Sequence, residues 1–123
     1  MILNMTQHDA TPEQIEAGVV NVPFRQELSV LLTFVELPTK KEIYSRVHKI
    51  CDIAWALTPW RDRVRQSVMI GGAPFLMGPL AETLKARNFS VLFAFSERVS
   101  SEKIVNGQVV KVSEFRHLGF VQA

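Results

Sequence analysis

Apolar residues along this chain alternate between short continuous runs and stripes at helical spacing. The short runs, which are typical of buried strands, are Met1-Ile2-Leu3, Val19-Val20-Asn21-Val22, Ser67-Val68-Met69-Ile70 and Val91-Leu92-Phe93-Ala94-Phe95. Helical stripes cover residues 23–34, 39–57 and 74–87, and a shorter helix follows Thr11. This order of strands and helices predicts an open α/β sheet, largely parallel, in a single domain spanning residues 1–123.

Polar residues at the helix ends support these boundaries. Thr11 with Gln14, and Thr39 with Glu42, have the spacing of capping boxes, in which the first side chain caps the helix and the second reaches back. Gly18 is expected to end the first of these helices, and Thr58 followed by proline the second.

The C-terminal part carries a hairpin signal. Asn106-Gly107 supplies the two positive φ angles of a type I′ turn between two apolar segments. A two-residue loop pairs Val105 with Gln108 and Glu102 with Lys111, and further along Glu97 with Arg116 and Ser96 with His117 unless a bulge intervenes. The sheet should therefore end in an antiparallel β-hairpin.

Composition narrows the class of protein. Of the 123 residues, 47% are hydrophobic and 21% charged, as in folded globular proteins, and the net charge of +2 does not indicate a protein that binds long nucleic acids. The single cysteine, Cys51, excludes an internal disulfide and gives no zinc-binding spacing, which favours a reducing, cytoplasmic setting. We expect no signal peptide and no membrane span, because the apolar runs are too short.

Two glycines give the strongest indication of a binding site. Gly71-Gly72 follows an apolar run, and Ala73-Pro74-Phe75 opens the next helix. Glycines allow a ligand to approach backbone N–H groups, and a helix N-terminus favours an anion such as phosphate. The pair lacks the spacing of a dinucleotide-binding GxGxxG motif and the lysine of a P-loop, so no cofactor or metal is indicated. The alternative is that the glycines serve only tight strand-to-helix packing.

Three polar segments follow predicted strands and should meet where the parallel strands end. They are Asn4–His8, Gly71–Phe75 and Ser96-Glu97-Arg98, and the hairpin is expected to bring Arg116 and His117 beside the third. Asn4, Thr6 and Gln7 could read a nucleobase edge, a ribose or a phosphate. The alternative is that Thr6 or Asp9 only caps the first helix.

Charged and titratable residues complete the candidate site. Arg98 and Arg116 could clamp a phosphate, or instead pair across the strands with Glu97 and Glu114. His8 and His117 have the pKa range of general acids and bases, and His117 should lie beside Ser96. The alternative for His8 is an exposed loop position, and no acidic residue is evidently placed to orient His117.

Other conspicuous residues have simpler interpretations. The basic connection at residues 60–65 holds Arg61, Arg63 and Arg65, which are typical of a solvated surface segment. Aromatic residues such as Trp55, Trp60, Phe93 and Phe95 are expected in the core or an interface. Cys51 should be a buried small hydrophobe.

Two segments resemble a known protein family. The opening Leu3–Gln14, with its Asn- and His-containing loop and Thr-x-Glu-Gln helix start, resembles small CRISPR-associated Rossmann-fold (CARF-like) and ring-nuclease proteins. Gly71-Gly72-Ala73-Pro74 before a leucine-rich helix is similar to the glycine-bearing loop of CARF domains. The resemblance implies a Rossmann-like sheet, a role in defence signalling, a homodimer, and binding of a cyclic oligoadenylate, which some small members cleave.

Three functions are therefore to be compared. The first is binding of a nucleotide or cyclic oligonucleotide second messenger, with metal-free cleavage by a ribose 2′-hydroxyl if the protein is an enzyme. The second is a non-catalytic oligomer-forming protein in which the hairpin edge pairs with another chain. The third, phosphoryl or glycosyl transfer on a mononucleotide, ranks last because Asp9 and Glu97 are the few carboxylates near the crevice.

Overall fold

The computed structural model describes residues 1–59 and 65–123. Most of the predicted basic connection, including Trp60, Arg61 and Arg63, lies outside the described residues, whereas Arg65 is exposed. The elements in chain order are β1 (Ile2–Asn4), α1 (Pro12–Glu16), β2 (Val19–Asn21), α2 (Arg25–Leu32), α3 (Lys40–Leu57), β3 (Ser67–Ile70), α4 (Pro74–Ala86), β4 (Ser90–Val105) and β5 (Gln108–Gln122). This order matches the prediction element for element.

The strands form one five-stranded sheet in the order β2-β1-β3-β4-β5. The pairs β1–β2, β1–β3 and β3–β4 are parallel, and β4–β5 is antiparallel. The predicted α/β sheet, mostly parallel with a C-terminal antiparallel hairpin, is confirmed. The chain leaves β1 toward β2 on one side and leaves β3 toward β4 on the other, so the strand order reverses between β1 and β3.

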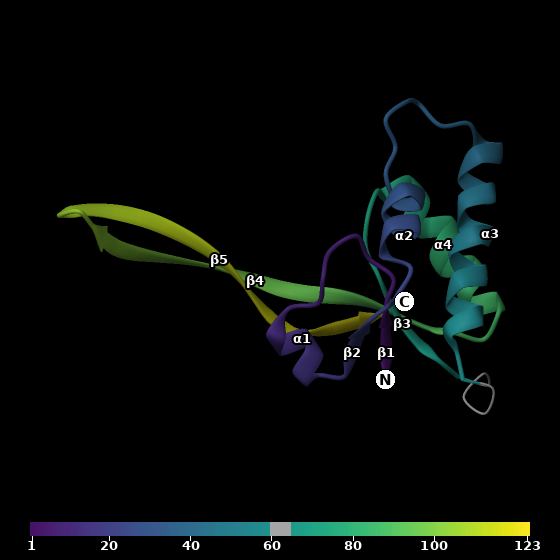
Figure 1. The fold of residues 1–123 in the computed structure, drawn as a ribbon, viewed down its shortest axis with the longest axis horizontal. Coiled ribbons are helices and arrows are strands. Elements are labelled where there is room, and N and C mark those ends of the chain that lie inside the picture. The colour runs from purple at the N-terminus through teal and green to yellow at the C-terminus, as the bar shows by residue number, and fades with distance from the viewer. Residues whose placement is uncertain (60–64) are drawn as a thin grey trace.

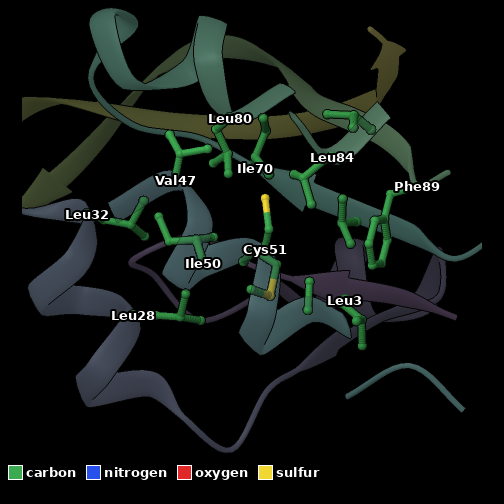
Figure 2. Close-up of a cluster of buried hydrophobic side chains, with 14 of the residues drawn as sticks. Leu3, Leu28, Leu32, Val47, Ile50, Cys51, Ile70, Leu80, Leu84 and Phe89 are labelled. Atoms are coloured by element: carbon green, nitrogen blue, oxygen red, sulfur yellow. The ribbon is translucent and has the colours of Figure 1, made fainter. Parts of the chain in front are cut away.

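The main core lies between the sheet and three helices. Helices α2, α3 and α4 lie together on one side of the sheet, and α1 lies on the other (Figure 1). Fully buried side chains from all three helices meet those of the central strands, among them Leu28, Val47, Ile50, Val68, Leu80 and Leu84. Figure 2 shows Cys51 within this cluster, and burial raises the pKa of its thiol to about 11. The predicted buried cysteine is confirmed.

The predicted helix ends are also confirmed. Thr11 and Gln14 form a complete capping box at the start of α1, so neither Thr6 nor Asp9 caps that helix. Thr39 accepts a hydrogen bond from the backbone N–H of Glu42 at the start of α3, but the Glu42 carboxylate pairs with an arginine one turn further along. The helix α3 ends at Leu57, as the Thr58-Pro59 pair predicts.

Strands β4 and β5 continue far beyond the rest of the sheet. The predicted register is present, and a bulge at Phe95/Ser96 follows the last predicted pair. Strand β3 pairs with β4 only as far as Phe93. The part of the hairpin spanning residues 97–116, here called the arm, projects away from the body (Figure 1). The predicted strand Val91–Phe95 is thus the base of one continuous 16-residue strand.

Two aromatic residues expected in buried positions are partly exposed. Trp55 contacts the Phe89 ring edge-on but is 38% exposed, and Phe95 is 56% exposed at the base of the arm. Within the described residues, no helix is long and apolar enough to cross a membrane.

Candidate functional site

A pocket of about 430 Å³ lies at the carboxyl ends of β1 and β3, beside Phe93 and Ala94 near the start of β4. We call it the strand-end pocket; its lining is Thr6, Gln7, His8, Asp9, Thr11, Gln14, Met69, Ile70, Gly71, Gly72, Phe93 and Ala94. Parallel strands end at the same edge of a sheet, which brings these loops together although they are far apart in sequence. The predicted meeting of the first two polar segments is therefore present.

Asn4 organises the loop that forms one wall of this pocket. Its side chain is fully buried, and Nδ2 donates to the His8 carbonyl and to Asn21 Oδ1, both at 2.8 Å. Oδ1 accepts from the Thr6 backbone N–H at 3.0 Å and from the Thr6 hydroxyl at 2.6 Å. Both donors and both acceptor positions of the amide are thereby used. Asn4 shapes the wall rather than offering free groups to a ligand.

The end of β2 supplies two residues that the sequence interpretation missed. Asn21 accepts hydrogen bonds from Asn4 and from the Ala10 backbone N–H. Arg25, the first residue of α2, contacts Asp9 through Nε at 3.0 Å and donates through Nη2 to the Gln7 carbonyl at 2.9 Å. Asn21 is the last residue of a strand that the sequence predicts, and Arg25 opens the helix that follows, so their position beside the carboxyl end of that strand was the available signal.

The glycine pair turns the chain from β3 into α4. Gly72 has φ +156°, and a Cβ there would lie 3.3 Å from the end of Met77. At Gly71 a Cβ would meet Thr6 Cγ2 at 3.6 Å, which is ordinary van der Waals contact. Gly72 therefore meets a backbone and packing requirement, whereas a Cβ at Gly71 would make an ordinary contact with Thr6.

The polar side of the pocket comes from the loop after β1. Gln7 donates through Nε2 to the Thr33 hydroxyl at the end of α2, which ties the loop to a second element. His8 is exposed, and the Asp9 carboxylate is balanced by Arg25. The opposite side is apolar, with Met69 and Ile70 both 2% exposed. The pocket thus combines an apolar floor with hydrogen-bonding groups along one wall.

The start of α4 lies just outside the lining. Ala73 and Pro74 follow the glycine pair, and Pro74 occupies the first helical turn. Phe75, which the helical stripe placed on the buried face, is 47% exposed and packs edge-on against Phe34 at 4.9 Å. These three predicted ligand contacts remain neighbours of the pocket rather than parts of its surface.

The third predicted segment does not join the site. Ser96, Arg98, Arg116 and His117 lie beyond the pocket lining because β4 continues straight into the arm instead of folding back. Arg98 lies 5.9 Å from the centroid of the Phe115 ring. Arg116 is opposite Glu97, as its alternative interpretation requires.

His117 is separated from the pocket by its packing. Its ring is edge-on to Phe120 with centroids 4.8 Å apart, and its buried Nδ1 has no hydrogen-bond partner among the described residues. Of the two predicted acid–base histidines, His8 lines the pocket and His117 does not. The part of the chain that the structure describes holds no group of three metal-ligating side chains.

A larger depression of about 650 Å³ lies between α2 and α3. Its lining is Gln26, Glu27, Val30, Leu31, Lys49, Asp52 and Ile53. It lies on helices away from the strand ends, and its acidic and basic residues are scattered along an open groove. The strand-end pocket remains the better candidate because backbone turns and hydrogen-bonded side chains from separate elements build it.

Comparison with known proteins adds a family. A family model, described as the uncharacterized protein MJ1673 family, matches residues 1–121. The chain belongs to this family. The match runs from β1 through all but the last residue of β5, so the strand-end pocket and the arm both fall within the MJ1673 family region. No curated protein and no solved structure matches the chain.

Proposed function

We propose that this protein binds a nucleotide in the strand-end pocket of a Rossmann-like sheet. The observation that carries the proposal is that the loops after β1 and β3 meet around one pocket beside Phe93 and Ala94 of β4, next to the point where strand order reverses. In open parallel sheets, ligands bind in the crevice at such a reversal, outside the carboxyl ends of the strands.

The phosphate position is assigned to the glycine turn. Gly71 and Gly72 line the pocket and lead directly into α4, where Pro74 has no N–H and Leu76 already donates to the Ala73 carbonyl at 3.0 Å. The backbone donors near the turn are therefore those of the turn itself and of Phe75. A phosphate there would accept from backbone N–H groups and lie near the positive end of the helix.

The base and ribose are assigned to the rest of the lining. Phe93 offers an apolar surface against which a base could lie, beside Met69 and Ile70, which are each 2% exposed. Thr6 and Gln7 provide the hydroxyl and amide groups of the opposite wall. A mostly apolar floor with a few fixed polar groups is the usual composition of small-molecule sites.

Charge in the pocket is compatible with an anion. Asp9 would repel a phosphate, but Arg25 lies 3.0 Å from its carboxylate and neutralises it. One further nitrogen of Arg25, Nη1, is buried with no hydrogen-bond partner among the described residues, and Arg25 itself is not part of the pocket lining.

The size of the pocket bears on the kind of nucleotide. A volume of about 430 Å³ lies within the range of ~300–1,000 Å³ for small-molecule sites. One nucleotide unit is the best match, and a cyclic oligonucleotide would extend beyond the pocket. We propose binding without catalysis, because only His8 of the two candidate acid–base histidines lines the pocket and His117 does not.

A thermal-shift titration tests this proposal. The probes are adenosine mono-, di- and triphosphate, cyclic oligoadenylates, and inorganic phosphate. A ligand at 100 times its Kd stabilises the fold by about 2.7 kcal/mol, which raises the Tm of a 123-residue domain by about 10 °C.

Two variants at one position provide the control. Gly71→Asp places a carboxylate where the phosphate is assigned and should abolish the shift. Gly71→Ala adds a methyl group that fits at 3.6 Å from Thr6 and should retain most of it. No shift with any nucleotide, or an equal shift in Gly71→Asp, would contradict the proposal.

A further inference from the structure

Within the described residues, the arm is a two-stranded ribbon that projects away from the rest of the sheet (Figure 1). Beyond Phe93, β4 has no partner on its inner edge within the described residues, and the arm exposes large apolar side chains. These are Val99 at 37%, Ile104 at 79%, Val105 at 51%, Val109 at 65%, Val110 at 42% and Phe115 at 72% exposed. An isolated two-stranded hairpin is at best marginally stable in water, and three or more strands are needed for independent stability. The arm therefore calls for an additional strand.

The outer edge of β5 is the natural place for such a strand. β5 is the last strand in the sheet order and is 15 residues long, whereas the opposite edge strand, β2, has three residues. An antiparallel strand directs alternate N–H and C=O groups away from its partner, so this edge presents unpaired backbone groups along its length. A long apolar edge of this kind favours pairing with another chain.

We infer that β5 pairs antiparallel with β5 of a second copy of this chain, about a two-fold axis at Phe115. In a symmetric pairing, residues equally distant from the axis face each other. With the axis at Phe115, the two Phe115 side chains are neighbours, and Glu114 faces the second copy's Arg116 on either side. The inference uses residues 113–117, which precede the bulge, and does not depend on the strand-end pocket.

Charge favours this axis over three others along β5. Arg116 lies opposite Glu97 within the chain, so the pairing creates a row of Glu97, Arg116 and the second copy's Glu114 with alternating sign. An axis at Lys111, Glu114 or Arg116 would instead place two like charges directly opposite each other, which is destabilising. Four basic and three acidic residues alternate along the arm, so a second copy is not repelled as a whole.

The other face of the ribbon is equally self-complementary. Arg98 lies 5.9 Å from the centroid of the Phe115 ring. Across the four paired strands, one row then reads Arg98, Phe115, the second copy's Phe115 and the second copy's Arg98. Aromatic and opposite-charge pairs across strands each contribute stability, and the symmetry repeats every pair except the central one.

The length of β5 sets the extent of the contact. Phe115 is the middle residue of β5, so the two strands lie side by side along a strip about 50 Å long and ~10 Å thick, with the pairing interrupted at the Leu118 bulge of each copy. This gives on the order of 500 Å² per copy, close to the ~600 Å² per partner at the lower end of stable interfaces. The pairing would turn each two-stranded arm into half of a four-stranded sheet.

Cysteine cross-linking of the full chain tests the position of the axis. Phe115→Cys places two thiols across the axis, where Cα atoms lie about 5.5 Å apart, and mild oxidation should give a covalent dimer. Ser113→Cys is the matched control, because its two copies would be about 13 Å apart and cannot form a disulfide. Cys51 is fully buried and should not contribute.

Light scattering after size exclusion tests the association itself. The wild-type chain should have the mass of a dimer at micromolar concentration. Glu114→Arg opposes Arg116 with a like charge and should raise the dimer Kd roughly tenfold or more, whereas Glu114→Gln should raise it less. Circular dichroism shows whether each variant keeps its fold.

A concentration of 100 μM is about a hundredfold excess over a micromolar Kd. A wild-type chain that stays monomeric at this concentration would overturn the inference. So would a dimer in which Phe115→Cys cross-links no faster than Ser113→Cys, or one that Glu114→Arg does not weaken. Nucleotide binding would be unaffected by these outcomes.

Discussion

Replacement of Asn4 by alanine should destabilise the protein far more than the loss of one polar surface group. The Asn4 side chain is fully buried and makes four hydrogen bonds, to the His8 carbonyl, to Asn21 and twice to Thr6. Alanine removes all four hydrogen bonds, so the partner groups on His8, Asn21 and Thr6 must bind water within a partly enclosed loop. The neighbouring Met5 is also fully buried, which limits how far that loop can open.

The size of the effect follows from those bonds. A typical intramolecular hydrogen bond contributes a net ~1 kcal/mol, and a buried group left unsatisfied costs about 1–3 kcal/mol. Asn21 keeps its bond from the Ala10 N–H, so it loses less than the others. We expect Asn4→Ala to lower the free energy of unfolding by about 3 kcal/mol, which is a large part of the stability of a small domain.

Urea unfolding measures this directly. With a slope of ~1–3 kcal/mol per molar urea, the midpoint should fall by about 1–3 M while the slope stays constant. Thr6→Ala is the control, because it removes only the hydroxyl bonds and should cost about 1 kcal/mol. If Asn4→Ala costs no more than Thr6→Ala, Asn4 does not organise the loop.

Three further predictions concern single positions. Gly72→Ala should cost about 1–3 kcal/mol in thermal unfolding because of its φ of +156° and the contact with Met77, whereas Gly71→Ala should be close to neutral. Thr11→Ala removes the cap of α1 and should cost about 1 kcal/mol in urea unfolding; a cost below ~0.3 kcal/mol would show that the cap is dispensable. Cys51 should react with a thiol reagent at pH 8 only after unfolding. The pKa of its thiol is about 11 in the fold against 9.0 ordinarily, so the unfolded state loses its proton first, and the free energy of unfolding should fall as the pH rises from 9 to 11. Cys51→Ala should abolish that decline, and an equal decline in the variant would contradict this cause.

Local signals explain why the order of elements could be predicted. The Thr11 and Thr39 caps and the Gly18 and Thr58 stops act within a few residues of themselves, and the structure keeps each of them. The Asn106-Gly107 turn, with φ +50° and +78°, fixes the register of every pair up to Ser96. Neither kind of signal depends on distant packing.

The path of the hairpin could not be predicted in the same way. The sequence predicts that the hairpin brings Arg116 and His117 to the strand ends. Whether a hairpin folds over a sheet or extends from it depends on what its faces pack against, and among the described residues the arm projects away from the helices and the rest of the sheet. The same applies to Phe75, because the helical period alone does not say which flank of α4 stays open.

The site was predicted in part because strand ends are visible in sequence. The loops after β1 and β3 were recognised, and they do form the pocket wall and turn. Asn21 and Arg25 were missed because the end of the short β2 was not considered. The distinct roles of Gly71 and Gly72 depend on which side chain lies next to each α-carbon. Only the folded structure shows these neighbours.

Amide chemical-shift changes during a nucleotide titration show whether a nucleotide binds at the strand ends. If it does, the largest changes occur at Gly71, Gly72 and residues 6–9, and they disappear in the Gly71→Asp variant. Shifts confined to the groove between α2 and α3, or no shifts with any nucleotide, would contradict it.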